Sequence, residues 1–113
     1  MPDEINRRIV LAARPVGVPR ESDFRLEEAP RPTARAGEMV CRTIWLSLDP
    51  YMRGRMSQQK SYVKGVEIGE VMTGETAGEV IESRHPAFRR GDKVTAPAGW
   101  QLYWCGKGEL LTK

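Results

Sequence analysis

The sequence contains few residues of the kinds that bind metals or form disulfides. Its 113 residues include two cysteines, Cys41 and Cys105, and one histidine, His85. Zinc sites need three or four Cys, His or carboxylate ligands at short fixed spacings, and these three residues lie far apart along the chain. Cys41 lies in an apolar run, where a buried thiol packs as a small hydrophobe. The sequence therefore predicts no metal site and no disulfide framework.

Long hydrophobic runs are also missing. No stretch approaches the roughly 18 consecutive apolar residues of a membrane helix. The first residues, MPDEIN, lack the basic and then apolar pattern of a secretory signal. We therefore expect a cytoplasmic protein that does not bind membranes. The 18 basic and 15 acidic residues are scattered through the chain, so a net charge of +3 gives no reason to expect a nucleic-acid partner.

A phosphate or dinucleotide site is not evident either. None of the 11 glycines forms a G-x-G-x-x-G pattern that follows a strand and opens a helix. Arg53 and Arg55 are candidates for binding a phosphate, but two guanidinium groups at a solvated helix end are the simpler interpretation. We expect Arg53 to pair with a neighbouring carboxylate and Arg55 to be solvated.

What the sequence does contain is short alternation of apolar and polar residues between glycines and prolines, which predicts a mainly β fold. We expect one domain, residues 1–113, built as a small, partly open β-barrel with one or two short helices. Asp49 and Pro50 resemble a helix start, in which Asp49 accepts hydrogen bonds from free backbone amides. The helix is expected at 50–56, and the strands at 8–13, 24–27, 38–48, 66–72, 76–83, 93–96 and 101–104.

The most specific feature is the stretch LSLDPYMRGRM at 46–56. It closely resembles the signature of a zinc-free branch of the medium-chain dehydrogenase/reductase superfamily. That branch includes leukotriene B4 12-hydroxydehydrogenase, the prostaglandin reductases, the plant alkenal double-bond reductases and bacterial curcumin reductase. Further matching pieces follow in the expected order at 65–72, 78–83, 88–94 and 99–101. The chain is thus identified as similar to the N-terminal, GroES-like domain of such an enzyme.

This resemblance implies a function and a set of site residues. The enzymes of this branch transfer hydride from NADPH to an α,β-unsaturated ketone or aldehyde, or to a quinone, and the cofactor lies mainly on a Rossmann domain. That domain is expected to follow these 113 residues, so this chain alone is expected to be inactive, and the full-length protein is open to homodimerisation. Tyr51 matches a cleft tyrosine and is the candidate hydrogen-bond donor or proton source. Met52, Tyr62 and Trp100 match positions that line the substrate pocket, and the resemblance assigns no cofactor-binding residue to this chain.

Two other interpretations stay open from the residues. One is a free-standing GroES-like module that binds or assembles without catalysis. The other is nucleic-acid binding through Arg53, Arg55 and the basic stretch 84–90. For Tyr51, a tyrosine packed in the core with a satisfied hydroxyl is the alternative to a catalytic role. Packing is also the alternative to pocket contact for Met52, Tyr62 and Trp100.

Overall fold

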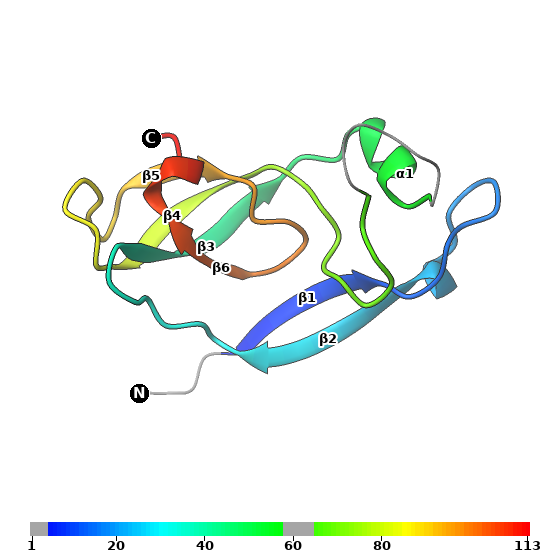
Figure 1. The fold of residues 1–113 in the computed structure, drawn as a ribbon, viewed down its shortest axis with the longest axis horizontal. Coiled ribbons are helices and arrows are strands. Elements are labelled where there is room, and N and C mark those ends of the chain that lie inside the picture. Colours follow the sequence, from blue (N-terminus) through cyan, green and yellow to red (C-terminus); the bar gives the residue numbers. More distant parts are fainter. Residues whose placement is uncertain (1–4, 58–64) are drawn as a thin grey trace.

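The computed structural model describes residues 5–57 and 65–113, and these residues form mainly antiparallel strands (Figure 1). One short helix and two 3₁₀ turns, at Glu21–Asp23 and Gly108–Leu110, complete the described part. In chain order the main elements are β1 (Ile5–Leu11), β2 (Phe24–Pro30), β3 (Glu38–Leu46), α1 (Tyr51–Arg55), β4 (Thr76–Ser83), β5 (Lys93–Ala96) and β6 (Tyr103–Lys107). No helix in these residues is long and apolar enough to cross a membrane.

The larger sheet has the order β5-β4-β3-β6, with β3 paired on both sides. Its antiparallel partners run from Leu46 opposite Thr76 to Met39 opposite Ser83 in β4, and β6 pairs along the other edge. The β3–β4 register shifts twice, between Val40 and Cys41 and between Thr43 and Trp45. Such bulges bend and twist a strand, which lets this sheet curve around its core.

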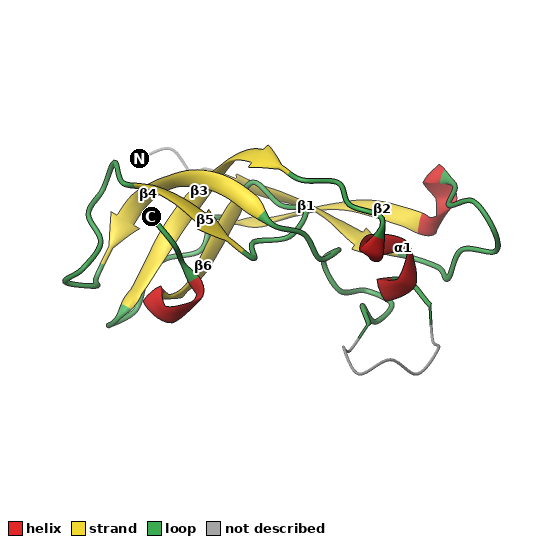
Figure 2. Ribbon diagram, turned by 90° about the horizontal axis from the view of Figure 1, so that it is seen from above, coloured by secondary structure: helices red, strands yellow, loops and turns green. Residues whose placement is uncertain are grey.

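The smaller sheet is the β1–β2 hairpin, and it meets the larger one at the connection between β5 and β6 (Figures 1 and 2). The backbone of Ile9 donates to the carbonyl of Trp100 at 2.9 Å, and that of Leu102 donates to Arg7 at 3.0 Å. Asn6 is only 4% exposed, and its side-chain oxygen accepts from the Tyr103 amide at 3.0 Å. A buried polar side chain thus joins the two sheets with its hydrogen bonds satisfied.

The core consists of three clusters of buried side chains. The first lies against β3, β4 and β5, the second lies between β1 and the segment that follows α1, and the third lies beside the pairing of β3 with β6. Their buried members are Met39, Cys41, Val80, Val94, Ala96, Ala98 and Leu111; then Leu11, Met56, Val66 and Met72; then Ala34, Val40 and Tyr103. Cys41 is 4% exposed, which confirms its expected role as a small buried hydrophobe.

The mainly β fold expected from the sequence is confirmed, although the two sheets are open and do not close into a barrel. The strands expected at 76–83 and 93–96 have the predicted bounds. The strand expected at 66–72 is wrong, because this segment forms a turn and a single bridge from Val71 to Val10. Val66 and Met72 are buried in the cluster with Leu11 of β1, whereas Ile68 between them is 51% exposed.

Gly78 in β4 offers a direct test of the close packing of β3 on β4. A Cβ at this position would lie 2.2 Å from the carbonyl oxygen of Arg42, which belongs to the β3 backbone and cannot move without breaking the sheet. We expect Gly78→Ala to lower the free energy of unfolding by about 3 kcal/mol or more, measured by urea denaturation.

Gly54→Ala in α1 is the control, because nothing lies within 4 Å of the added carbon. It should leave stability unchanged or raise it by up to about 1 kcal/mol. Equal stability of the two variants would contradict the register.

Candidate functional site

The candidate site begins where β3 ends and α1 starts. The amide of Ser47 donates to the carbonyl of Glu75 at 3.0 Å, and its hydroxyl donates to Asp49 Oδ2 at 2.8 Å. The expectation that the Asp49 side chain caps the helix is wrong, because no side chain caps α1 and Pro50 already has helical angles. The Asp49 carbonyl, not its carboxylate, accepts from Met52 at 3.1 Å. A polar turn therefore sets the direction in which α1 leaves the sheet.

Tyr51 is the first residue of α1 and is 42% exposed. The guanidinium carbon of Arg55 lies 4.9 Å from the centroid of its ring. Within residues 5–57 and 65–113 no hydrogen bond involves the Tyr51 hydroxyl. Tyr51 therefore does not have the satisfied hydroxyl of a core tyrosine, and it presents a donor at the surface of the described domain. Its proposed chemical role is a prediction that this geometry does not test.

Met52 and Trp100 are brought together, but toward the interior. Met52 is 4% exposed. A Cβ on Gly74 would lie 3.1 Å from Met52 Cε and 3.3 Å from Trp100 Cδ1, so both side chains meet over this glycine. The Trp100 ring also stacks on Phe24, with 5.5 Å between centroids. Their predicted contact with substrate stays a prediction, and Tyr62 lies outside the described residues.

The indole nitrogen of Trp100 is buried and has no hydrogen-bond partner among the described residues. The turn before it requires Gly99, which has a φ of +75° and whose added Cβ would lie 2.6 Å from the Met72 carbonyl. This turn fixes the direction in which the indole enters the interior.

Arg53 anchors α1, although not through the carboxylate expected from the sequence. Its guanidinium donates to the carbonyls of Gly17 and Pro15, both at 3.1 Å, and to Ser57 Oγ at 3.0 Å. That expectation is wrong because the turn after β1 offers backbone oxygens that suit the planar fork of an arginine. Arg14 was not singled out from the sequence, yet its Nη1 donates to the carbonyl of Val66 at 2.6 Å and also to that of Met56 at 3.1 Å.

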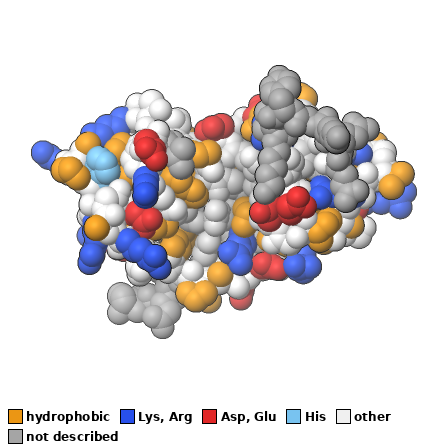
Figure 3. Space-filling model, viewed as in Figure 1, with side chains coloured by type: hydrophobic (Ala, Val, Ile, Leu, Met, Phe, Trp, Pro, Cys, Tyr) orange, Lys and Arg blue, Asp and Glu red, His pale blue; other side chains and the backbone are white. Residues whose placement is uncertain are grey.

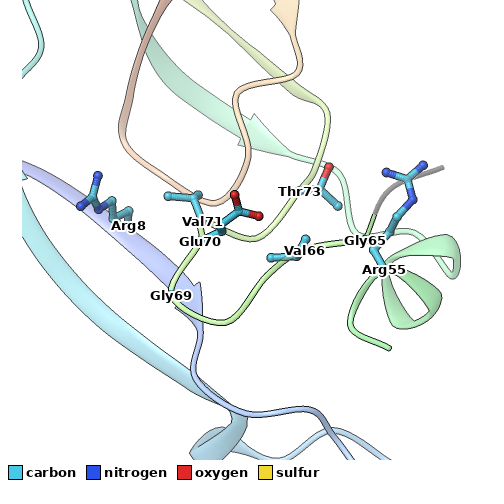
Figure 4. Close-up of a pocket in the computed structure, with 8 residues that line it drawn as sticks. All are labelled: Arg8, Arg55, Gly65, Val66, Gly69, Glu70, Val71 and Thr73. Carbon is cyan, nitrogen blue, oxygen red and sulfur yellow. The ribbon is translucent and has the colours of Figure 1, made fainter. Parts of the chain in front are cut away.

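A polar groove of about 470 Å³ lies beside α1 (Figure 4). The chain approaches α1 closely at its edge, where the Val66 amide donates to the Arg55 carbonyl at 2.7 Å and Gly65 leaves no room for a Cβ. Arg55 lines this groove in addition to covering Tyr51, so it is not merely solvated. The lining residues are Arg8, Arg55, Gly65, Val66, Gly69, Glu70, Val71 and Thr73.

Exposed apolar side chains lie at the end of β3 and in its connection to α1. Trp45 is 74% exposed, Leu48 is 71% exposed and Ile44 is 43% exposed. Two adjoining hollows of about 490 and 450 Å³ share Trp45, Ala77 and Thr95 in their lining. An exposed apolar patch of this kind marks a surface for another part of a protein or a partner. The face shown in Figure 3 carries Lys, Arg, Asp and Glu side chains interspersed with hydrophobic ones.

The two cysteines have little nucleophilic character. Burial raises the pKa of the Cys41 thiol to about 11. The pKa of Cys105 is also raised to about 11, first by burial and then by the hydrogen bond from its Sγ to Glu38 Oε1 at 3.3 Å. Among the described residues no three His, Cys, Asp or Glu side chains are grouped as metal ligands would be. The polar groups that the described residues present beside α1 are the Tyr51 hydroxyl and the Arg55 guanidinium.

Comparisons with known proteins show the family to which this chain belongs. Residues 7–113 match the family model described as the N-terminal domain of oxidoreductase. The chain belongs to this oxidoreductase family. The resemblance to the reductase branch of the medium-chain superfamily, noted from 46–56, is thereby confirmed.

The relatives of this oxidoreductase domain are longer proteins. It is 51% identical over 108 residues to the NADPH-dependent curcumin reductase of Escherichia coli, a match that covers 96% of the chain and 31% of that enzyme. It is 37% identical to bovine prostaglandin reductase 1, over 87% of the chain and 28% of that protein. The crystal structure of CurA from Vibrio vulnificus superposes with a TM-score of 0.89 at 51% identity, covering 91% of the chain and 30% of CurA. The domain thus spans about a third of the length of these relatives.

The raised thiol pKa values predict slow alkylation. At pH 7.5 we expect iodoacetamide to modify the folded domain at least about a hundredfold more slowly than a cysteine peptide of ordinary pKa. The rate should rise about tenfold per pH unit until pH approaches 11, because only the thiolate reacts. Mass spectrometry gives the rates, and the urea-unfolded domain is the control, since it should react at the peptide's rate. Rapid modification of the folded domain at pH 7.5 would contradict the raised pKa of the two thiols.

Proposed function

We propose that this oxidoreductase domain is the substrate-side part of a longer NADPH-dependent enzyme. That enzyme reduces the carbon–carbon double bond of α,β-unsaturated ketones or aldehydes, or reduces quinones. The observation that carries the proposal is the 51% identity to an NADPH-dependent curcumin reductase over 96% of the chain. The placement of Tyr51 supports it, because the site described above offers a donor and no reactive thiol.

The described residues do not fit the role of a dinucleotide cradle. A pyrophosphate is held at the start of a helix that follows a strand and a glycine-rich turn. Here α1 has five residues and follows the sequence Leu46 to Pro50, which contains no glycine. NADPH, which supplies a hydride when bound, is therefore assigned mainly to the remaining two thirds of the longer protein. The chain by itself is expected to be inactive.

In this proposal the chain acts on the carbonyl oxygen of the substrate. When the β-carbon of an enone gains a hydride, the electrons of the double bond move toward the carbonyl oxygen, which becomes an enolate oxygen. A hydrogen-bond donor aimed at that oxygen stabilises the developing charge. The Tyr51 hydroxyl is such a donor, and a proton that reaches the α-carbon completes the saturated product. In this proposal the packing of Met52 and Trp100 in the interior supports the position of Tyr51 on α1.

The exposed apolar surface of Ile44, Trp45 and Leu48 has a proposed occupant, the remaining part of the same longer protein. Thr112 and Thr95 exchange two backbone hydrogen bonds, of 2.7 and 3.1 Å, so the last residues of the domain lie along β5. Lys113 itself lines the hollow beside Trp45. The matched family model is of an N-terminal domain and the relatives are about three times as long, so in this proposal the polypeptide that follows Lys113 begins at this surface and covers it.

Tyr51→Phe tests the donor role in the full-length protein. The variant keeps the ring and removes the hydroxyl, so we expect kcat for enone reduction with NADPH to fall by about tenfold to a hundredfold. The melting temperature should stay within about 1 °C, because the side chain is 42% exposed.

Tyr103→Phe is the matched control, since Tyr103 is a buried tyrosine of β6 in the third core cluster. It should change the melting temperature more than it changes kcat. Unchanged turnover of Tyr51→Phe with a panel of enones and quinones would overturn the donor role.

Trp45→Asp tests the proposed covering of the apolar surface. If the rest of the protein packs on Trp45, a carboxylate there is buried without a partner, and the full-length protein should lose about 2 kcal/mol or more of stability. Leu26→Asp in β2 is the control, because it makes the same change at a strand residue that is 64% exposed. Chemical denaturation of both variants gives the comparison. If Trp45→Asp lowers the free energy of unfolding by no more than Leu26→Asp does, the apolar surface around Trp45 is uncovered in the full-length protein.

A further inference from the structure

Tyr51 and Arg55 are four residues apart in α1, a spacing that places side chains on the same face of a helix. The 4.9 Å between the guanidinium carbon and the ring centroid is within the range of a cation–π contact. The described residues include no carboxylate paired with Arg55, so the tyrosine ring is the principal contact of its charge. A positive charge thus covers the ring of the proposed donor.

The backbone of Arg55 is held from outside the helix. Its carbonyl accepts from the Val66 amide at 2.7 Å, and a Cβ on Gly65 would lie 2.9 Å from the same oxygen. The preceding turn of α1 is bonded through the Arg53 guanidinium to the carbonyls of Pro15 and Gly17. A helix of five residues cannot keep its own shape in water, so these external bonds fix the position from which Arg55 reaches the ring.

The Tyr51 ring has no such external anchor in the described residues. It is 42% exposed, and its hydroxyl makes no hydrogen bond there. A tyrosine side chain turns about two torsion angles, so an uncovered ring at a helix start would sample several directions. The guanidinium restricts it to one side of α1.

We propose that Arg55 is a positioning residue, which holds the Tyr51 ring so that its hydroxyl is directed at the substrate oxygen. This inference rests on the function proposed above. Arg55 need not touch the substrate or the cofactor, because it acts through the ring. Its effect is therefore expected only when the Tyr51 hydroxyl is present.

A double-mutant cycle in the full-length protein tests this dependence. Arg55→Gln should lower kcat for enone reduction by about threefold to tenfold, the size of a lost cation–π contact and its ordering effect. In the Tyr51→Phe background the same change should alter kcat by less than twofold. Arg55→Lys should recover most of the loss, because an ammonium also binds the ring face. Arg53→Gln is the control: it disturbs the backbone anchor of α1, so it should lower the melting temperature as well as activity.

Each outcome has a definite meaning. If Arg55→Gln lowers kcat by the same factor in the wild-type protein and in the Tyr51→Phe variant, the positioning role is overturned. A rise in KM for substrates that carry a carboxylate, with kcat unchanged, would also overturn it, since Arg55 would then bind substrate directly from the groove in Figure 4. The donor role of Tyr51 fails separately, when Tyr51→Phe alone leaves turnover unchanged, and the positioning role falls with it. The proposed function itself fails when the full-length protein reduces no enone or quinone with NADPH. Loss of kcat together with a lowered melting temperature in Arg55→Gln, unrelieved by lysine, would show a structural role only.

Discussion

The pairing of β3 with a strand on each side is the interaction on which the rest of this domain depends. Its ladder with β4 requires the bare backbone of Gly78, and its ladder with β6 carries the third core cluster. The same strand ends at Leu46 and leads through four residues into α1. The position of Tyr51 is therefore set by a central strand of the sheet together with the bonds that hold α1 from outside the helix. A site attached in this way keeps its geometry as precisely as the sheet does.

Much of the sheet could be predicted from the sequence, because alternation follows directly from burial on one face. The segment 66–72 shows the limit of this reasoning. Its backbone forms hydrogen bonds to Leu11 and Ile9 of β1. The turn at Gly69 interrupts these hydrogen bonds, so they do not form a continuous strand ladder. The expected capping of α1 by the Asp49 side chain was wrong because of a local hydrogen bond. Asp49 is a good capping residue, yet the hydroxyl of Ser47 competes locally for its carboxylate.

The sequence names candidate residues where a motif carries them and misses those that depend on tertiary contacts. Tyr51 lies inside 46–56, so the resemblance assigns it as the candidate donor, and that role stays a prediction. The bonds of Arg14 and Arg53 to backbone carbonyls leave no trace in the sequence, since any residue provides a carbonyl. The exposure of Trp45 was equally hidden. Ile44, Trp45 and Leu46 form a continuous apolar run that indicates a buried strand, whereas the bulge after Thr43 turns Trp45 outward.

The arginine contacts that hold α1 differ in kind from those on the rest of the surface. Arg7–Glu28 and Arg42–Glu79 are ion pairs between exposed partners, and dissolved salt screens such pairs. Arg14 and Arg53 bond mainly to neutral backbone oxygens, those of Val66 and Met56 and those of Pro15 and Gly17, and Arg14 adds an ion pair with Glu67. Screening acts weakly on a short bond between a charge and a dipole. The position of α1, and of Tyr51 on it, should therefore change little over a wide range of ionic strength. The exposed ion pairs on the rest of the surface weaken as the salt concentration rises.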